Sequence, residues 1–368
     1  MTSGPPRVRF PGDGGFHADL KVRVGAHLAG AGRVRWGGAA MRAKTGLIFA
    51  WLAASYVPLL LWGGTSLLLA AGLTLSVALA TAGIGFSVMH DANHGAYARS
   101  AAVNRAVGLA LDFVGASSYV WRFKHNVHHH TYANVDGMDA DIDAEPFLRL
   151  APSQPLRGFH RWQHLYAWPL YGVLALKWWF VDDVVDLVRC RIGRHPFPRP
   201  RGLELAAAVG GKLVFLAWTL AVPALVHRSG WIALPFVLGS LTLGVVLATV
   251  FQLAHAVPEA EFHAAVADRQ MPTGWAEHQV RATVDFAPSN RLLGWYVGGL
   301  NFQVEHHLFP DVCHVHYAEL APIVQATCAA HGLPYRTRPT LRAAIAAHYT
   351  FLRALGRSSA IRPAALAA

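Results

Sequence analysis

Residues 65–94 read TSLLLAAGLTLSVALATAGIGFSVMHDANH, an apolar run that ends in two histidines. A run of about 20 apolar residues is long enough to cross the hydrocarbon of a bilayer as a helix. His90 and His94 follow the run directly, and their spacing of four residues places both side chains on one helix face. Imidazole is the commonest neutral ligand of redox-active transition metals. The stretch therefore predicts a membrane span that carries a pair of metal-binding side chains at its end.

Composition indicates that the whole chain is an all-α integral membrane protein. It is 54% hydrophobic and only 14% charged, with a mean hydropathy of +0.30. Gly63-Gly64 predicts a tight turn between the first two spans, and residues 227–230 predict a second turn between the last two. An even number of crossings returns the chain to the side where it started, so all histidine clusters are expected on one face. We expect four transmembrane helices, at about residues 45–62, 65–89, 204–226 and 231–253.

The charge pattern indicates how the chain lies in the bilayer and excludes nucleic acid as a partner. The net charge is +11, but the basic residues flank the apolar runs, as the positive-inside rule describes. The N-terminus has no apolar signal segment, so we expect it and the histidine clusters on the cytoplasmic side. Cys190, Cys313 and Cys328 form no CxxC pair and predict neither a disulfide framework nor a thiolate metal site. The expected organisation is an N-terminal arm (1–44), a membrane domain (45–334) and a helical C-terminal tail (335–368).

A second histidine cluster lies in the stretch WRFKHNVHHHT, residues 121–131. Four histidines in a short run lower helix propensity and bring nothing to an apolar core, so they need a functional reason. Two triplets are compatible with one helix face. His125 can pair with His128 and His129, or with His129 and His130, and the residues alone leave this choice open.

The third cluster is NFQVEHHLFP, with His306, His307 and, three residues before His306, Gln303. The amide oxygen of Gln303 is able to bind a metal or to accept a hydrogen bond from bound water. His255 follows the fourth span and adds another candidate ligand. So many nitrogen donors exceed the needs of one ion, and they predict a dinuclear site.

Other polar residues receive more modest interpretations. Asp139 and Asp141 follow the second cluster and are candidates to orient a ligand or a substrate. His314 and His316 are expected to pack at the membrane interface. Further histidines, among them His160, His164 and His348, are expected at the surface or facing lipid headgroups.

Together these motifs resemble the membrane fatty acid desaturase family. They read HDANHGAY (90–97), HNVHHHTYAN (125–134) followed by DADID, FQLAHAVPEAEF (251–262) and GGLNFQVEHHLFPDVCHVHYAELAPIV (298–324). Gln303 in place of the first histidine of the third box resembles the front-end, or linoleoyl-CoA-desaturase-like, branch. The resemblance implies four spans with a cytoplasmic helical cap around a di-iron site, and O2-dependent insertion of a cis double bond into a fatty acyl chain. It carries Gln303 over as a functional box residue, and the implied iron ligands are His90, His94, His125, His129, His130, His255, His306 and His307.

Two details of the resemblance are specific to this chain. The second box of that branch usually reads HNVLHHTY, which favours the triplet 125/129/130 and makes His128 a bystander. The HPGG motif of a fused cytochrome b5 domain is not found in the sequence. Electrons are therefore expected from a separate ferredoxin, rubredoxin or cytochrome b5 with its reductase.

Two alternatives remain at this point. A hydroxylase of the same membrane scaffold, acting on alkyl, carotenoid or sphingolipid chains, would use the same residue types. A membrane metal-binding or transport protein is less compatible, because transporters place their ligands near the midplane of the spans. We expect a desaturase in the cytoplasmic membrane of a bacterium, with the bilayer, a fatty acyl substrate and an electron-transfer protein as its partners.

Overall fold

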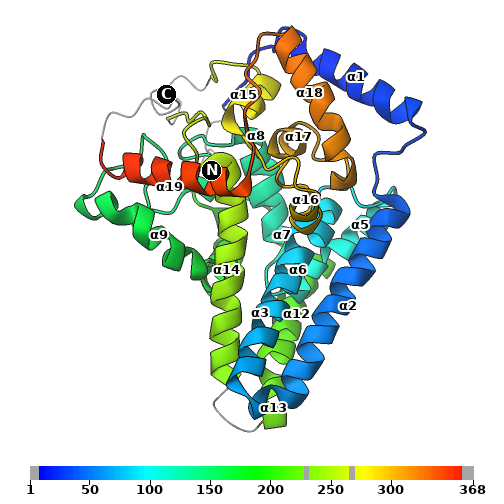
Figure 1. Cartoon of the computed structure of the whole chain (residues 1–368), viewed down its shortest axis with the longest axis vertical. Helices are drawn as coiled ribbons and strands as arrows, with labels where there is room; N and C mark the ends of the chain where they lie inside the picture. The colour runs from blue at the N-terminus through cyan, green and yellow to red at the C-terminus, as the bar shows by residue number, and fades with distance from the viewer. Residues whose placement is uncertain (1–7, 228–231, 265–269, 359–368) are drawn as a thin grey trace.

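The computed structural model describes residues 8–227, 232–264 and 270–358, and these are mostly helical (Figure 1). Four helices are long and apolar enough to cross a membrane, which confirms the prediction from the apolar runs. They run along the long axis of the molecule, and most of the shorter helices lie at the upper end in Figure 1. The four membrane-crossing helices are Gly38–Thr65, Leu67–Asn93, Leu203–His227 and Ala233–His255.

The first two spans form an antiparallel hairpin, and the second span contacts both the first and the fourth. Ser66 begins the second span, because its side chain accepts a hydrogen bond from the backbone N–H of Leu69. Of the turn predicted at residues 227–230, all but His227 lies outside the described residues. The spans consist of α2 (Gly38–Trp62) with η1 (Gly63–Thr65); α3 (Leu67–Gly83), η2 (Ile84–Met89) and α4 (His90–Asn93); α12 (Leu203–Leu216), η7 (Ala217–Ala221) and α13 (Val222–His227); and α14 (Ala233–His255).

Helix α2 begins well before the apolar run that predicted it. It starts at Gly38, whereas the run starts at Thr45. Lys44 is buried in this first part of the helix, where its Nζ contacts His314 Nε2 at 2.8 Å and donates to the carbonyl of Trp295. A charged residue can continue the helix here because partners from the C-terminal region satisfy it.

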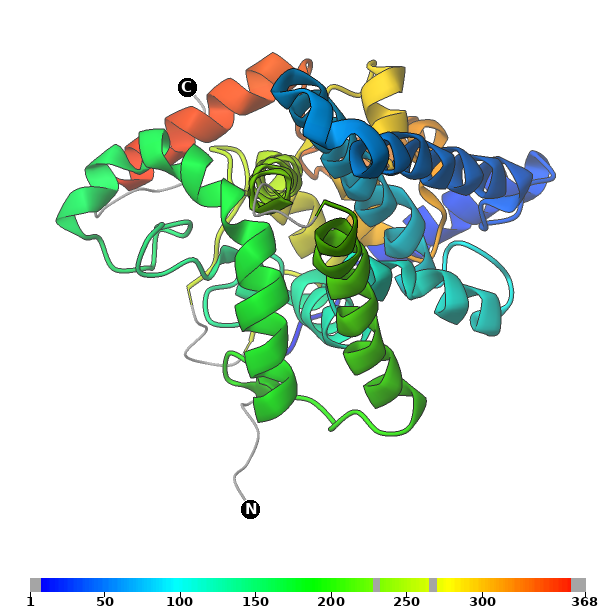
Figure 2. The same ribbon diagram turned by 90° about the horizontal axis from the view of Figure 1, so that it is seen from below.

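The N-terminal helix α1 (Phe16–Gly30) packs against α18 (Tyr317–Ala330). Its buried residues Phe16, Leu20 and Val24 recur every four positions and therefore form one apolar stripe. Helix α9 extends to one side of the spans in both views (Figures 1 and 2). The other helices are α5 (Ala101–Gly108), α6 (Ala110–Phe113), α7 (Ser118–Trp121), η3 (Arg122–His129), α8 (His130–Tyr132), η4 (Ala140–Ile142), η5 (Gly158–Trp162), α9 (Gln163–Gly172), α10 (Leu174–Lys177), η6 (Trp178–Asp182), α11 (Asp183–Arg189), α15 (Trp275–Ala282), α16 (Arg291–Tyr296), α17 (Gln303–Leu308), η9 (His314–His316) and α19 (Leu341–Leu355).

Strands are few and short in the described residues. β1 (Arg191–Ile192) and β2 (His195–Pro196) form an antiparallel hairpin, with Ile192 opposite His195. β3 (Asp285–Phe286) and β4 (Thr337–Arg338) pair in parallel. This second pair joins the segment before the third histidine cluster to the segment before α19.

A glycine brings the third cluster against the second span. Gly298 has φ +61°, and a Cβ at this position would lie 2.2 Å from the carbonyl oxygen of Phe86 in η2. Only glycine fits both the left-handed backbone and this close approach. Helix α17, which carries the third cluster, is thereby held beside the helix that carries the first.

Candidate metal centre

The structure brings all eight predicted ligand histidines together. They come from the end of the second span, from η3 and α8, from the end of α14 and from α17. Within each of three groups, one ligand atom per residue lies within 4.8 Å of the others. The groups are His90, His94, His125 and His306; His129, His255 and His307; and His130, His306 and His307.

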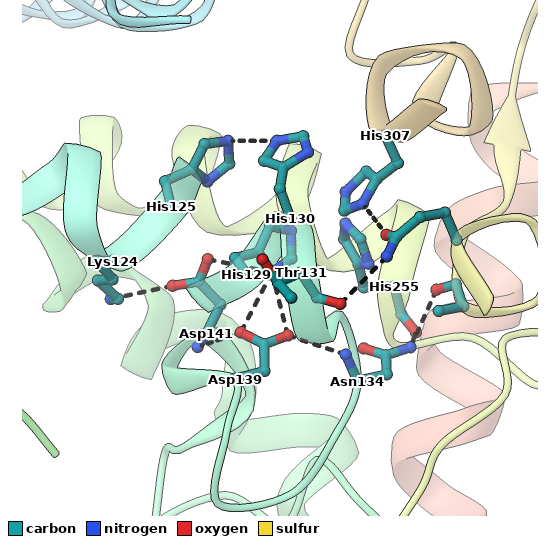
Figure 3. A network of polar contacts seen from close by, with 12 residues as sticks. Lys124, His125, His129, His130, Thr131, Asn134, Asp139, Asp141, His255 and His307 are labelled. Atoms are coloured by element: carbon teal, nitrogen blue, oxygen red, sulfur yellow. Dashed lines mark hydrogen bonds and ion pairs between the residues drawn. The ribbon is translucent and has the colours of Figure 1, made fainter. Parts of the chain in front are cut away.

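The second cluster lies on a π-helix rather than an α-helix. In η3, the backbone N–H of His130 donates to the carbonyl of His125, five residues earlier. This wider turn places His125, His129 and His130 toward the same region, and the Nε2 atoms of His125 and His130 are 3.2 Å apart (Figure 3). His128 points away, and its ring lies 4.6 Å from that of His195. π-helical turns are rare and occur mostly at functional sites.

The first cluster also follows a π-helical turn, η2, at the end of the second span. His90 and His94 have ring centroids 4.7 Å apart. The indole of Trp121 stacks on His125 at 4.3 Å and contacts both rings of the first cluster edge-on. A large aromatic side chain thus forms one wall of the site and fixes three of its imidazoles.

Unpartnered ring nitrogens test whether these residues fit a metal. A buried polar atom without a partner costs about 1–3 kcal/mol, so such atoms are rarely left unsatisfied. Seven of the eight histidines nevertheless have a buried ring nitrogen with no hydrogen-bond partner among the described residues. The all-imidazole donor set suits transition metals such as iron, copper, nickel and zinc. The atoms are Nε2 of His90, His94, His129, His306 and His307, and Nδ1 of His130 and His255.

Neighbouring polar groups hold the opposite ring nitrogens of three of these histidines. His129 Nδ1 lies 3.1 Å from Asp139, His307 Nδ1 lies 2.8 Å from Gln279 Oε1, and His306 Nδ1 lies 3.2 Å from the hydroxyl of Tyr317. Such contacts fix the tautomer, so that Nδ1 carries the proton and Nε2 is free to bind a metal.

Burial sets the protonation state of most of the cluster. It lowers the pKa of each of five histidines well below the ordinary value, and the neighbouring histidines lower it further. These rings are therefore neutral, which is the form that binds a metal. The five are His94, His125, His130, His306 and His307.

His129 differs because a carboxylate adjoins it. Burial acts to lower the pKa of His129, but Asp139 outweighs burial and raises it. Burial opposes the charged form of Asp139 as well, yet His129 and two backbone N–H groups lower the pKa of this carboxyl to about 2. The carboxylate charge is therefore kept inside the protein, directly behind the ring (Figure 3).

Asn134 fixes the loop that follows the second cluster. It has φ +58°, a left-handed conformation that asparagine tolerates better than most residues. Its side-chain amide donates to the carbonyls of His255 and Ala282, and its backbone N–H donates to Asp139. One fully buried side chain thereby joins the loop to the end of the fourth span and to α15.

Gln303 lies at the edge of the cluster. It is buried, and its Nε2 is 2.9 Å from His255 Nε2. Asp141, the other acidic candidate, is 3.6 Å from His129 Nδ1 and pairs with Lys124.

Several histidines that were predicted at the surface are buried. His160, His164 and His348 are 0%, 4% and 0% exposed. His160 contacts the carbonyl of Pro146 at 2.9 Å, and His348 contacts the hydroxyl of Tyr171 at 2.8 Å. The prediction was wrong for His160 and His348 because a neutral imidazole with a polar partner is readily buried. The ring of His164 packs edge-on against Tyr349, at 5.0 Å between centroids.

A separate buried polar network, distinct from the histidine clusters, lies beside the first span. Asp91 Oδ2 contacts His314 Nδ1 at 2.8 Å and accepts a hydrogen bond from the thiol of Cys313 at 2.8 Å. His314 also contacts Lys44. His314 is therefore part of a buried polar network, not interfacial packing as predicted. The network joins the first histidine cluster to α2 and η9.

The sequence did not point to these supporting residues. Asn134 and Gln279 lie 121 and 28 residues from His255 and His307, which they contact, and Tyr317 lies 11 residues from His306. Asn134 and Tyr317 had a local signal, because Asn134 closes the HNVHHHTYAN motif and Tyr317 lies in the stretch 298–324.

Comparisons with known proteins agree with this arrangement. The fatty acid desaturase family model matches residues 65–339. The chain is 36% identical over 362 residues to the sn-1 linoleoyl-lipid 6-desaturase of Arthrospira platensis, covering 96% of both proteins. It is 36% identical over 355 residues to the enzyme of the same name from Synechocystis, covering 96% of this chain and 99% of that one. It is also 38% identical over 307 residues to an acyl-lipid (8-3)-desaturase of Physcomitrium patens, covering 82% of this chain and 64% of that protein.

The family match spans three of the four membrane-crossing helices and every histidine of the three groups. Two relatives align over nearly their whole length, and the sequence motifs give the same assignment. The chain belongs to the fatty acid desaturase family and is a membrane enzyme that introduces double bonds into fatty acyl chains.

Proposed function

We propose that the eight histidines hold two iron ions and that the substrate is an acyl chain carried by a membrane lipid. The observation that best supports the metal is the set of seven buried ring nitrogens without partners. They belong to three groups, each of which contains His306, His307 or both. Imidazole ligands alone do not select iron. Iron follows from the family together with the need for an oxidant strong enough to remove hydrogen from an unactivated methylene.

The overall reaction sets what the site must supply. A –CH2–CH2– unit, O2, two electrons and two protons give a –CH=CH– unit and two molecules of water. Bound iron would supply the O2 chemistry and accept the external electrons. The protein supplies neutral imidazoles, the contacts of Asp139, Gln279 and Tyr317 that orient them, and a buried setting that keeps bulk water away. We assign Gln303 to the reacting site, where its amide adjoins His255.

The names of the relatives favour a lipid-linked substrate. Both relatives that align over nearly their whole length are linoleoyl-lipid 6-desaturases. We therefore propose a linoleoyl chain esterified to a membrane lipid, with the new double bond at position 6. An apolar cavity of about 90 Å³ lies between the spans and would receive the methyl end of the chain. Its lining includes Tyr56, Ala78, Thr81, Phe215, Trp218 and Gly239.

We further propose that the metal site faces the cytoplasm from a bacterial cytoplasmic membrane. The basic residues near the histidine clusters support this orientation through the positive-inside rule. Residues 45–334 would then form the desaturase domain, between the N-terminal arm and the C-terminal tail, with electrons delivered by a separate carrier protein.

The test is the fatty-acid profile of a host that expresses the protein and is supplied with linoleate. The wild-type chain should yield a triene with a new double bond at position 6, and His129→Ala should yield none. His128→Ala is the matched control, because this adjacent histidine lies outside the three groups. It should keep both the product and about two irons per chain. A hydroxylated product would contradict desaturation, and equal iron content in His129→Ala and wild type would contradict the ligand assignment.

A further inference from the structure

An arginine-rich segment lies between α11 and α12. Residues 187–203 contain no aspartate or glutamate. Neighbouring cations have acidic partners: Arg105 and Arg122 pair with Glu204. None of the five arginines of the segment forms an ion pair with any residue that the structure describes, and all five are exposed. We call residues 189–201 the basic segment. Its arginines are Arg189, Arg191, Arg194, Arg199 and Arg201.

The basic segment is folded and fixed in place. The β1–β2 hairpin forms its centre, and the buried side chains of Ile192 and Phe197 hold it against the protein. Phe197 stacks on Phe123 of η3 at 5.2 Å, and the hydroxyl of Tyr119 donates to the carbonyl of Pro198 at 2.7 Å. The segment joins α11 to α12, and both helices are seen from below in Figure 2. Ile192 and Phe197 face inward, whereas Val188 and Leu203, at the two ends of the stretch, are 78% and 87% exposed. Between these ends, the arginines are the exposed charged side chains of the segment.

The helix beneath the hairpin is the one that carries the second histidine cluster. Phe123 and Tyr119 face the hairpin, whereas His125 and His129 face the metal site. The ring of His195 in β2 lies 4.6 Å from that of His128, the histidine that points out of the cluster. The basic segment is thus separated from the predicted ligands by one helix, which is about 10–12 Å across.

We propose that the basic segment is the docking surface for an acidic one-electron carrier protein. This inference rests on the proposed function, in which two electrons from outside the chain combine with O2, two protons and the two hydrogens of the acyl chain to give two waters. The histidines are buried, so a carrier cannot touch them and must dock on an element that covers them. Unpaired arginines over the second cluster meet this need, because a positive patch steers and orients a negatively charged partner.

Anionic lipid headgroups are the competing partner for exposed arginines beside a span. The segment lacks the exposed Trp and Tyr that commonly anchor a chain at the headgroup level. It also stays attached to the second cluster through Phe197 and His195. These features favour a protein, and not the bilayer, as the partner of the arginines.

The test compares charge reversal at the hairpin with the same change elsewhere. Arg191→Glu/Arg194→Glu alters the hairpin, and Arg342→Glu/Arg353→Glu makes the same charge change on exposed positions of α19. Each purified protein, in neutral detergent, is given reduced [2Fe–2S] ferredoxin, and desaturation is measured against ferredoxin concentration. The hairpin variant should show a KM for ferredoxin raised about tenfold at low ionic strength, with kcat unchanged at saturation. Added salt should remove the difference from wild type, and the α19 variant should behave as wild type.

Further measurements separate the alternatives. Desaturation driven by reduced methyl viologen needs no docked protein and should be equal in all variants; its absence in wild type would overturn the proposed function itself. An unchanged KM in the hairpin variant would overturn the docking surface. Should that variant instead lose binding to phosphatidylglycerol vesicles, the arginines serve the membrane and the proposal is wrong. Arg191→Lys/Arg194→Lys keeps the charge and should restore the ferredoxin KM.

Discussion

Asp139 is held by three groups at once. Its carboxylate lies 3.1 Å from His129 Nδ1 and accepts hydrogen bonds from the backbone N–H groups of Asn134 and Asp141, each at 2.9 Å. The side chain is 2% exposed. The backbone therefore fixes the position of the Asp139 carboxylate, and this carboxylate orients the ring of His129.

Asp139→Asn should weaken metal binding while leaving the fold intact. The amide keeps the shape but removes the negative charge that orients the ring and increases its basicity. Changes of this kind typically cost about 10–100-fold in metal affinity. Iron retention against a chelator measures the effect, and Asp143→Asn, in an exposed position of the same acidic run, is the control. Equal retention in both variants would show that the contact with Asp139 has no role in binding.

At the residue level, sequence motifs identified the histidines but not most of what orients them. The eight predicted ligands all lie in the three groups. Gln279 and Tyr317 contact His307 and His306 from other helices, and Gln279 lies outside every quoted motif. Contacts of this kind depend on packing between distant segments, which local spacing does not specify.

At the level of elements, η3 shows why the second cluster was ambiguous. A period of 3.6 residues aligns His125 with both His128 and His129. The π-helical turn adds a residue to the period and aligns His125 with His129 and His130 instead. A π-helix has no reliable sequence signal, so the choice required either the resemblance to a family or the structure.

Helix α19 is joined to the rest of the protein through His348, which gives it a pH-dependent stability. His348 contacts the hydroxyl of Tyr171 at 2.8 Å and the carbonyl of Ala256 at 2.7 Å. Burial lowers the pKa of His348 from 6.5 to about 4. The unfolded chain takes up the proton more readily than the folded one. The contribution of the neutral His348 ring to stability is therefore complete above pH 6.5 and is lost as the pH falls toward 4.

His348→Gln should therefore flatten the dependence of stability on pH. The lowering of the His348 pKa from 6.5 to about 4 corresponds to roughly 3 kcal/mol of unfolding free energy between these two pH values. Unfolding midpoints in detergent at pH 7.5 and pH 5.0 give the slope for wild type and variant. Other buried histidines contribute to both slopes, so the difference between the slopes isolates His348. Parallel slopes would show that this ring does not stabilise α19 in its neutral form.

At the scale of the whole molecule, the apolar runs predicted the four spans well. Length and hydropathy are sufficient for this, because a bilayer imposes one minimum span on every crossing helix. The packing of the shorter helices at one end was not predictable, since it depends on contacts such as that of Gly298 with Phe86. The early start of α2 was missed for a similar reason, because the partners of Lys44 lie near the C-terminus.

The cavity between the spans gives a prediction about chain length. Ala78 is buried and lines the cavity, so Ala78→Leu should shorten the space for the methyl end of the acyl chain. Turnover of an 18-carbon substrate should fall several-fold, while a substrate shorter by two to four carbons should be affected less. Ala54→Leu, at an exposed position of α2, is the control. An equal loss for both chain lengths would place the methyl end elsewhere.

The distribution of the histidines along the chain also determines when the centre can form during biosynthesis. Each of the three all-histidine groups contains His306 or His307, whereas the earliest members of the groups are His90 of the second span, His129 of η3 and His130 of α8. A ribosome must therefore translate five-sixths of the protein, including all four membrane-crossing helices, before any group is complete. In the proposed centre, metal loading would consequently be a late maturation step, and a nascent chain that stalls before the third box would lack part of every group.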